Sequence, residues 1–329
     1  MELINTKNIF LLGSKDEYTL LKTWIHDNKS SHLHLNGWYY DKEIPIDSSD
    51  LVTKFENMAG MEIVDHFVLD PSDLDPKILD ASINWAESKG ARVHLIQNST
   101  STLTKKIERL NRFGPFAAVP LRQEPLSQPK NKIFKKIFDY LLSTFVFFGI
   151  FWWFYIIVGV LIKLSGKGPV VIKQNRVGIN GLRFKCLKFR TMTSNKLAEK
   201  GIGKITNLND SRVTWIGKIL RQTNLDELPQ FINVLFGDMS VIGPRPHMLS
   251  EDKEIENKIE RYRIRRFIKP GITGLAAIRG YRGGTEDMHI MQKRIDYDLE
   301  YLENWNLFLD IKIALITFWQ MITLNTRGY

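Results

Sequence analysis

The sequence predicts an α/β protein in three parts: an N-terminal Rossmann-like module with a parallel sheet (residues 1–128), a linker with a membrane-inserted, re-entrant helix (129–165), and a compact α+β domain with interfacial helices (166–329). Three observations lead to this prediction. Strand and helix patterns alternate in the first part, and a single long apolar run follows. Short alternating runs mixed with amphipathic helices fill the last part.

Composition limits the class of protein. A chain of 329 residues with 43% hydrophobic content can form two domains with packed cores. The formal charge of +10 indicates an anionic partner, which charge alone leaves open between nucleic acid, a phosphorylated small molecule and an anionic membrane surface. Cys186 is the only cysteine, so a disulfide within the chain is excluded, a zinc cluster is disfavoured and a reducing cytoplasmic setting fits. The N-terminal residues show no secretory signal.

The first part alternates strands and helices. KNIFLLG reads as a buried strand before a helix, and further strands are expected in HLHLNGWYY, EIVDHFVLD and ARVHLIQ, with helices around 51–58 and 78–86. This order is typical of a doubly wound parallel sheet. A dinucleotide site would need G-x-G-x-x-G after the first strand, whereas only Gly13 is present, so a structural or regulatory module is favoured. The proline-rich segment 113–131 is predicted to be a linker.

The second part contains a run from Tyr140 to Ile162 whose only polar side chains are hydroxyls, about as long as a bilayer-spanning helix. A helix that is apolar on every face favours membrane insertion over a soluble core. Lysines flank the run on both sides, and both flanks are therefore expected on the cytoplasmic side. A helix that enters one leaflet and returns satisfies both flanks if it bends, with Gly149 as a weak point. A straight span is the alternative.

The third part begins with two predicted strands, GPVVIKQNRVG and LRFKCLKFRTM, and the second places Lys185, Lys188 and Arg190 near one another. This cluster is either a solvated or headgroup-binding edge or part of a substrate site. The last helix, Trp305 to Leu324, is apolar but contains Asp310 and Lys312. It is interpreted as an interfacial helix, with a packing helix as the alternative.

An adjacent acid pair, Asp226 and Glu227, lies in the stretch TNLDELPQFINVLFGDMSVIGPRP. Pro229 fits a helix only within the first turn, so a helix is expected to start near Asp226 and to end at Gly237. Alone, such a pair is most simply a capping feature. Arg221 before it and Arg245 on the Gly-Pro-Arg-Pro turn after it instead indicate a site that handles phosphate.

From Asn131 onward the blocks KIFKKIFDY, GPVVIKQNRVG, KFRTM, RQTNLDELPQFINVLFGDMSVIGPRPH, KPGITGLAAIRGYRGGTED and LDIKI resemble, in order, the bacterial sugar transferases, the monotopic polyprenyl-phosphate phosphoglycosyl transferases. The resemblance implies that residues 166–329 form the catalytic domain. It implies transfer of a sugar 1-phosphate from a UDP-sugar (glucose, galactose or a related hexose) to undecaprenyl phosphate. UMP would be released through a covalent aspartyl-phosphosugar intermediate, with Mg²⁺, and polysaccharide or glycan assembly would begin.

The resemblance also implies roles for particular residues. Asp226 would be the nucleophile and Glu227 its dyad partner, and both would lie at the Mg²⁺. The residues assigned to substrate phosphates are Lys188, Arg190, Arg221, Arg245 and Arg282, the last for the uridine phosphate. His247 has the family position without a derived role. The chain departs from the family at Trp152 and Trp153, which replace the Ser-Pro pair that usually breaks the membrane helix.

The expected partners are the UDP-sugar, undecaprenyl phosphate and membrane lipids, and a homodimer is left open. No nucleic acid is expected, because the basic residues gather around the acid pair and the membrane flank without a nucleic-acid motif. The expected location is the bacterial inner (cytoplasmic) membrane, with the catalytic domain on the cytoplasmic face. The alternative function is a non-catalytic, membrane-anchored nucleotide-sensing regulator or scaffold, which the intact acid pair opposes.

Overall fold

The computed structural model describes residues 6–39, 48–59, 64–72, 74–97, 112–193, 212–282 and 287–323. The chain divides into two compact units, residues 1–123 with 260–264 and residues 124–259 with 265–329. The two units are described separately below.

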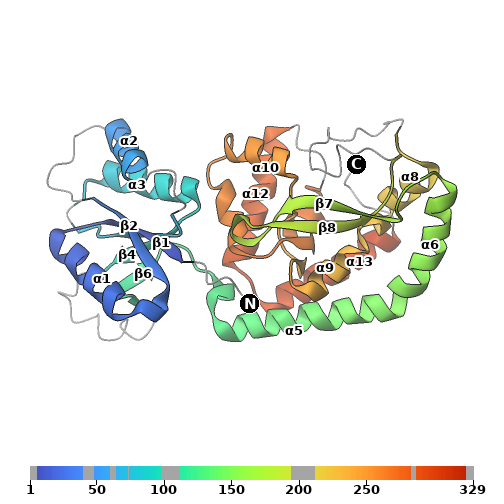
Figure 1. The fold of residues 1–329 in the computed structure, drawn as a ribbon, viewed down its shortest axis with the longest axis horizontal. Helices are drawn as coiled ribbons and strands as arrows, with labels where there is room; N and C mark the ends of the chain where they lie inside the picture. Colours follow the sequence, from blue (N-terminus) through green and yellow to red (C-terminus); the bar gives the residue numbers. More distant parts are fainter. Residues whose placement is uncertain are drawn as a thin grey trace. The chain divides into compact units, whose positions relative to one another are not determined.

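The first unit is a mixed six-stranded sheet with the strand order β2-β1-β3-β4-β6-β5 (Figure 1). The strands are β1 Lys7–Leu12, β2 Leu33–Tyr39, β3 His66–Leu69, β4 Arg92–Ile96, β5 Arg112–Phe113 and β6 Phe116–Pro120. Strands β1 to β4 are parallel, as the alternation of patterns predicts, whereas β6 runs antiparallel to both β4 and β5.

Helices cover both faces of this sheet. They are α1 Lys15–Asp27, α2 Ser48–Ala59 and α3 Pro76–Lys89. Because side chains alternate along a strand, Phe10 and Leu12 of β1 join the core with Phe55 of α2 and Trp85 of α3, while Ile9 and Leu11 pack toward Leu21 of α1. Two buried layers therefore enclose the sheet.

The linker prediction for residues 113–131 is wrong over its first half. Residues Phe116–Pro120 form β6 and pair with β4. The prolines that suggested a loop stand at the edges of the strand, Pro115 in the turn before β6 and Pro120 as its last residue, where a missing N–H costs no internal pair. Composition alone does not distinguish prolines at the ends of a strand from prolines in a linker.

The second unit is built along a helix of 36 residues, Pro129–Leu164, the only described helix long and apolar enough to cross a membrane. It comprises α5 Pro129–Val146, a π-helical segment Phe147–Phe151 and α6 Trp152–Leu164. Figure 1 shows that α5 and α6 run in different directions on either side of this segment. The predicted weak point, Gly149, lies inside it, and π-helical turns are a common cause of helix bends.

This helix is not the buried core of a soluble domain, because only 22% of its most apolar window is buried. One face of it packs, through Val146, Phe151, Val158 and Ile162, in a core with residues of the segments that follow. The other face leaves large apolar side chains exposed, namely Leu141, Phe145, Phe148, Trp152, Ile156 and Val160.

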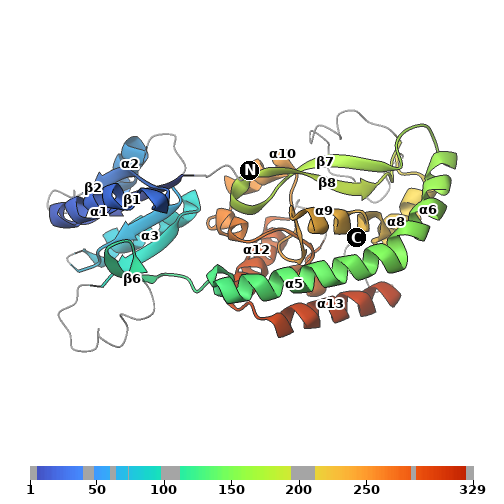
Figure 2. The same cartoon turned by 60° about the horizontal axis from the view of Figure 1, so that its bottom comes forward.

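The remaining elements surround two small sheets. An antiparallel hairpin joins β7 Val171–Val177 to β8 Arg183–Phe189, and β9 Ser240–Ile242 pairs in parallel with β10 Gly271–Thr273. The helices are α8 Trp215–Gln222, α9 Gln230–Phe236, α10 Leu249–Glu256, α11 Leu275–Ile278, α12 Met288–Glu303 and α13 Leu307–Ile322, several of which are labelled in Figure 2.

The last helix, α13, has two distinct faces. Phe308, Leu315, Phe318 and Trp319 are exposed on it, whereas Asp310 is fully buried. The acidic residue that interrupts the apolar run in the sequence therefore points into the protein, and the exposed surface of the helix is more apolar than the sequence suggests.

Candidate active site

The acid pair lies in a 3₁₀ turn, Leu225–Glu227, between α8 and α9. Asn224 enters the turn in the left-handed region with φ of 57°, a conformation that asparagine tolerates. Pro229 stands directly before α9, and Gly237, with φ of 86°, ends the helix as predicted. The expected helix start near Asp226 is thus a separate tight turn followed by α9. The turn holds both carboxylates in buried positions.

Glu227 is surrounded by cations. Its Oε1 atom lies 2.8 Å from Lys188 Nζ and 3.0 Å from Arg245 Nη2, and its Oε2 atom lies 3.4 Å from Arg282 Nη2. Burial by itself would raise the pKa of Glu227, but Arg245, Lys188 and Arg282 outweigh burial and hold the pKa well below its ordinary value. Glu227 is therefore a carboxylate that stays charged and fixes three basic side chains around the turn.

Asp226 has a different environment. Within the described part of the chain, its carboxylate makes no hydrogen bond and no ion pair. Burial raises the pKa of Asp226, and the neighbouring Glu227 raises it further, against the opposing effect of Lys188, Arg221 and Arg245. The result is a carboxylate oxygen without a bound donor beside a cluster of cations, which is the arrangement that a carboxylate nucleophile attacking an anion requires.

The backbone of the Gly-Pro-Arg-Pro turn is fixed by two arginines, the half-buried Arg176 and the buried Arg265. Arg176 of β7 donates to the Pro246 carbonyl at 3.2 Å, and Arg265 donates to the Arg245 carbonyl at 2.7 Å. Arg265 is in turn paired with Asp298 at 2.8 Å. Rigid support of this kind limits the positions that the Arg245 side chain can reach, which favours a preorganised phosphate site.

Not all predicted site residues meet at the dyad. The structure brings together Asp226, Glu227, Lys188, Arg245 and Arg282, while Arg221 lies close enough to influence the charge of Asp226 and donates from Nε to Thr191 Oγ1 at 2.9 Å. Of the predicted cluster on β8, Lys185 is exposed and takes no part. The part of the GYRGGTED block from 283 to 286 lies outside the described residues.

Arg190 points elsewhere. Its Nη2 atom donates to the Ile162 carbonyl at 2.7 Å and to the Gly166 carbonyl at 2.6 Å, at the C-terminal end of α6. A cation at this position satisfies backbone acceptors that the end of a helix leaves unpaired. Because β8 ends at Phe189, the two-residue alternation that would place Arg190 beside Lys188 no longer applies to it. A substrate contact of Arg190 stays a prediction.

Two residues near the site were not assigned from the sequence. His247 is buried, with Nδ1 3.1 Å from Arg265 Nη1 and Nε2 3.4 Å from Arg294 Nη1. Burial and these two arginines lower the pKa of His247 well below its ordinary value, so the imidazole is neutral. Arg294 lines a small pocket together with Arg245, Arg282 and Tyr281.

A signal for Arg294 did exist in the sequence. Met291, Ile295, Leu299 and Leu302 form the buried stripe of α12, and Arg294 and Asp298 fall on the same face of the helix. Charged residues at apolar positions of an amphipathic helix are buried only when they are paired.

The acid pair has oxygen atoms of the kind that Mg²⁺ prefers. Among the described residues no group of three or more His, Cys, Asp or Glu side chains could hold a metal alone. Mg²⁺, however, is commonly bound by one or two carboxylates with phosphate oxygens of the substrate. The Asp226 oxygens have no hydrogen bond within the described residues, and Glu227 Oε2 has only the 3.4 Å contact from Arg282. The donor set therefore fits Mg²⁺ bound together with a phosphorylated substrate.

Comparison with known proteins identifies relatives. The family described as bacterial sugar transferase matches residues 130–324. A UDP-glucose:undecaprenyl-phosphate glucose-1-phosphate transferase of Klebsiella pneumoniae is 44% identical over 209 residues, 64% of this chain and 44% of that protein. An undecaprenyl-phosphate glucose phosphotransferase of Komagataeibacter xylinus is 37% identical over 320 residues, 94% of this chain and 58% of that protein. An exopolysaccharide production protein of Rhizobium leguminosarum bv. phaseoli is 42% identical over 178 residues, 53% of this chain and 87% of that protein.

The extent of these matches differs. This chain spans about half the length of the Klebsiella and Komagataeibacter proteins. In the Rhizobium protein the matching region makes up 87% of the whole.

Proposed function

The chain belongs to the bacterial sugar transferase family, and we propose that it transfers a sugar 1-phosphate from a UDP-sugar to undecaprenyl phosphate, releasing UMP and initiating exopolysaccharide assembly. The observation that supports this proposal most is the asymmetry of the acid pair, with Glu227 held by three cations and Asp226 left without a donor among the described residues. Glucose is the proposed sugar, because the names of the Klebsiella and Komagataeibacter relatives specify it.

The proposed chemistry has two displacements. An Asp226 carboxylate oxygen attacks the β-phosphorus of the UDP-sugar, and the bond from this phosphorus to the bridging oxygen breaks. UMP leaves with that electron pair, and the sugar phosphate stays on Asp226 as an acyl phosphate. An oxygen of undecaprenyl phosphate then attacks the same phosphorus, the bond to Asp226 breaks, and the carboxylate is regenerated. Dividing the transfer in this way means that two bulky substrates need not be bound together.

The basic residues would stabilise the negative charge that develops on the phosphate oxygens during the transfer. Lys188, Arg245 and Arg282 converge on Glu227, and their charges are available to phosphate oxygens that gain charge as the bonds change. Asp226 and Glu227 would hold Mg²⁺, which when bound would neutralise charge on the diphosphate oxygens. Of the three basic residues that contact Glu227, Arg245 is the best placed for direct contact with a substrate phosphate. Its side chain is 35% exposed, whereas the side chains of Lys188 and Arg282 are nearly buried.

We propose that the long helix enters one leaflet of the inner membrane and returns, which leaves the catalytic domain on the cytoplasmic face. The π-helical segment with Gly149 provides the bend in place of the Ser-Pro pair that Trp152 and Trp153 replace. The exposed apolar residues of α13, Phe308, Leu315, Phe318 and Trp319, would lie in the interface. Leu228, next to the dyad, shares a core with Val146 and Phe151 of the long helix, which supports a site close to the membrane.

Cysteine accessibility separates this geometry from a straight span. Cys186 is buried and gives a low background, so single cysteines at exposed positions 127 and 167, Ser127→Cys and Lys167→Cys, can be labelled in sealed vesicles. Both are expected to react from the same side, because both flanks of the helix are basic and favour the cytoplasmic side. Full labelling of each after detergent treatment is the control. Reaction from opposite sides would show that the helix spans the bilayer.

The N-terminal module, which we propose to be Rossmann-like, gives little support to the alternative of a nucleotide-sensing regulator or scaffold. In such modules, phosphate binds at the helix N-terminus that follows the first strand. Here the Glu17 carboxylate accepts the Ser14 N–H at 2.7 Å as part of a capping box at the start of α1. A carboxylate of the module itself thus takes the position that a nucleotide phosphate would need.

An assay of membranes tests the proposed function. Membranes that contain the protein are incubated with undecaprenyl phosphate and labelled UDP-glucose, UDP-galactose or UDP-N-acetylgalactosamine. We expect UMP and a lipid-linked product with UDP-glucose at a rate above that of the other two nucleotides. Release of UDP instead of UMP would indicate transfer of the sugar without its phosphate and would contradict the proposal. Absence of any lipid-linked product with all three nucleotides would favour the regulator or scaffold.

A further inference from the structure

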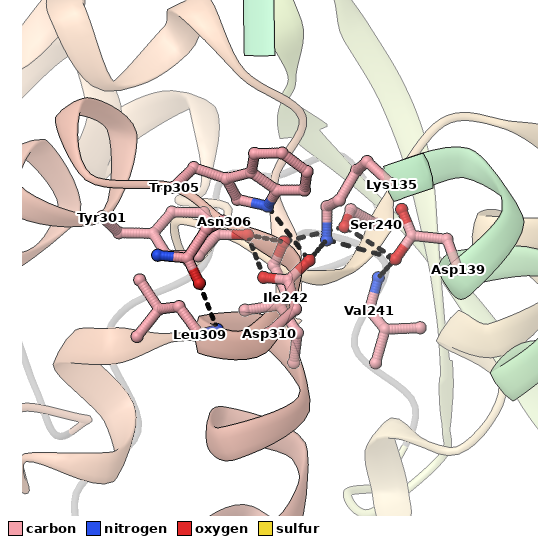
Figure 3. A network of polar contacts seen from close by, with 10 residues as sticks. All are labelled: Lys135, Asp139, Ser240, Val241, Ile242, Tyr301, Trp305, Asn306, Leu309 and Asp310. Carbon is pink, nitrogen blue, oxygen red and sulfur yellow. Dashed lines mark hydrogen bonds and ion pairs between the residues drawn. The ribbon is translucent and has the colours of Figure 1, made fainter. Parts of the chain in front are cut away.

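A buried polar network joins the long helix to the catalytic domain (Figure 3). Lys135 of α5 lies 3.3 Å from Asp139 Oδ1, one turn further along the helix, and 2.8 Å from Asp310 Oδ2 of α13. All three side chains are buried, Asp310 completely. Charges in such a position are tolerated only with several hydrogen-bond partners, so the network has a defined geometry.

Each carboxylate has further donors. Asp310 accepts from Tyr301 Oη at 2.7 Å and from Trp305 Nε1 at 3.1 Å. Asp139 accepts from the backbone N–H of Val241 at 3.0 Å, and the Ser240 hydroxyl lies 3.0 Å from the same oxygen. The first set fixes α13 and the end of α12. The second set fixes β9, a strand that lies more than a hundred residues away from Asp139 in the sequence.

Strand β9 needs this support. It has three residues, and among the described strands it pairs with β10 alone, through Ser240 and Ile242. Val241 between them donates its N–H to Asp139 of α5. Two-stranded sheets of this size are marginal without packing partners. The Asp139 carboxylate therefore supplies an acceptor for the N–H of Val241, which would otherwise be a buried, unpaired donor.

Strand β9 leads directly into the active site. Gly243 and Pro244 follow it, and the next residue is Arg245, whose guanidinium pairs with Glu227 at 3.0 Å. Gly243 also packs tightly, because a Cβ atom there would lie 2.4 Å from the Lys269 carbonyl oxygen. A displacement of β9 would therefore be transmitted to Arg245, because the two residues between them are tightly packed or conformationally restricted.

We propose that Asp139, on the membrane-inserted helix, is a positioning residue for Arg245, and that the network of Lys135, Asp139 and Asp310 couples the seating of this helix to the active site. The inference rests on the proposed function where it is tested by enzyme kinetics. The test by hydrogen exchange does not depend on the proposed function. Asp139 does not contact the dyad, and it acts through the backbone of β9. The membrane helix is therefore part of the catalytic geometry as well as an anchor.

The kinetic test is a double-mutant cycle. Asp139→Ala is expected to lower kcat by about 10- to 100-fold, because a small misplacement of a phosphate-binding group has effects of this size. The KM for the UDP-sugar should change less than kcat. In the Arg245→Ala background the same substitution is expected to lower kcat by less than about twofold, since the residue that it positions is absent. Lys136→Ala, an exposed neighbour on α5, is the matched control and should leave kcat unchanged.

Two outcomes of this cycle overturn the proposal: full kcat in Asp139→Ala, or an equal loss in both backgrounds, which would indicate a general structural role. If Asp139→Ala does not accumulate in membranes, Asp139→Asn takes its place. Its amide oxygen can still accept from Val241, so a smaller loss with the same non-additivity is expected, and an additive loss counts against the proposal.

The structural test needs no substrate. Hydrogen exchange of the wild-type protein and the Asp139 variant in detergent is compared, and faster exchange is expected at residues 240–245 but not in the β7–β8 hairpin. Unchanged exchange at 240–245 would overturn the coupling. If the wild type transfers no sugar phosphate while the exchange result is as expected, the proposed function fails and the coupling stands.

Discussion

Asp226→Asn is expected to abolish sugar phosphate transfer, with a loss of about 10⁴-fold or more in the rate of UMP release, because an amide oxygen cannot form the acyl phosphate. The substitution is nearly isosteric. The fold should persist, since no hydrogen bond or ion pair of the carboxylate is lost within the described residues. The rate is measured with UDP-glucose and undecaprenyl phosphate in membranes of matched protein content.

The stability of this variant provides a second readout. Burial raises the pKa of Asp226, which means that the charged carboxylate destabilises the folded state at pH values above its ordinary pKa. Because Asp226→Asn removes this charge, the Tm of the variant is expected to be equal to or higher than that of the wild type. Such a gain is common where a residue needed for activity destabilises the fold. Asp238→Asn, at an exposed acid after α9, is the matched control and should retain activity. Turnover of Asp226→Asn within about tenfold of the wild type would exclude Asp226 as the nucleophile.

Arg245→Ala is expected to lower kcat by about 10²- to 10³-fold, the usual effect of removing one preorganised group that stabilises charge in a transition state. Glu227 keeps Lys188 and Arg282 as partners in this variant, so its charge stays compensated and the fold is retained. Arg245→Lys should recover only part of the rate, because an ammonium group cannot form the two-pronged contact of a guanidinium with phosphate.

The control for this series is Arg183→Ala, which removes an exposed arginine from β8 and should leave kcat unchanged. Rates are measured over a range of UDP-glucose concentrations up to saturation, which separates kcat from KM. A change in KM alone, with kcat of the wild type, would place Arg245 in ground-state binding and would remove it from the charge-stabilising role.

Much of the site followed from local sequence. Asp226, Glu227 and Arg245 lie in one stretch of the chain, and Pro229 and Gly237 bound the helix that the pattern predicted. The family assignment, which rested on blocks in the same order, is confirmed by the match over residues 130–324. The predicted helix end at Gly237 is confirmed, whereas the helix begins at Gln230 and not near Asp226. Local patterns indicate the presence of the turn and the helix because their signals act over a few residues.

Other features depend on contacts between distant segments. Arg190 and Lys188 share a basic run, yet β8 ends between them, and Arg190 reaches the carbonyls of α6 instead of the dyad. Lys135 appeared to be one of several flanking lysines, while its burial against Asp310 is set by how α13 packs. No periodicity in either segment specifies the other, so tertiary packing alone decides these partners.

The buried network also changes the interpretation of the long helix. Its lysine flank suggested only orientation in the bilayer, but Lys135 and Asp139 of α5 face the protein. Asp139 accepts from the strand that precedes Arg245, and Lys135 pairs Asp139 with Asp310 of α13. In the proposed mechanism, Asp226 attacks a soluble nucleotide sugar, and a lipid phosphate then attacks the phosphorus bound to Asp226. This side chain must therefore be placed accurately relative to the bilayer. A polar contact between α5 and β9 provides one physical means of doing so.

Trapping of the covalent intermediate tests the central claim most directly. The purified protein is mixed with UDP-glucose without undecaprenyl phosphate, quenched, and digested for mass spectrometry of the peptide that contains Asp226. The account predicts a glucose phosphate adduct on Asp226 and a stoichiometric burst of UMP, both absent in Asp226→Asn, and loss of the adduct when undecaprenyl phosphate is added. UMP that forms only in the presence of undecaprenyl phosphate, with no adduct on the enzyme, would contradict it and would indicate direct transfer between the two substrates.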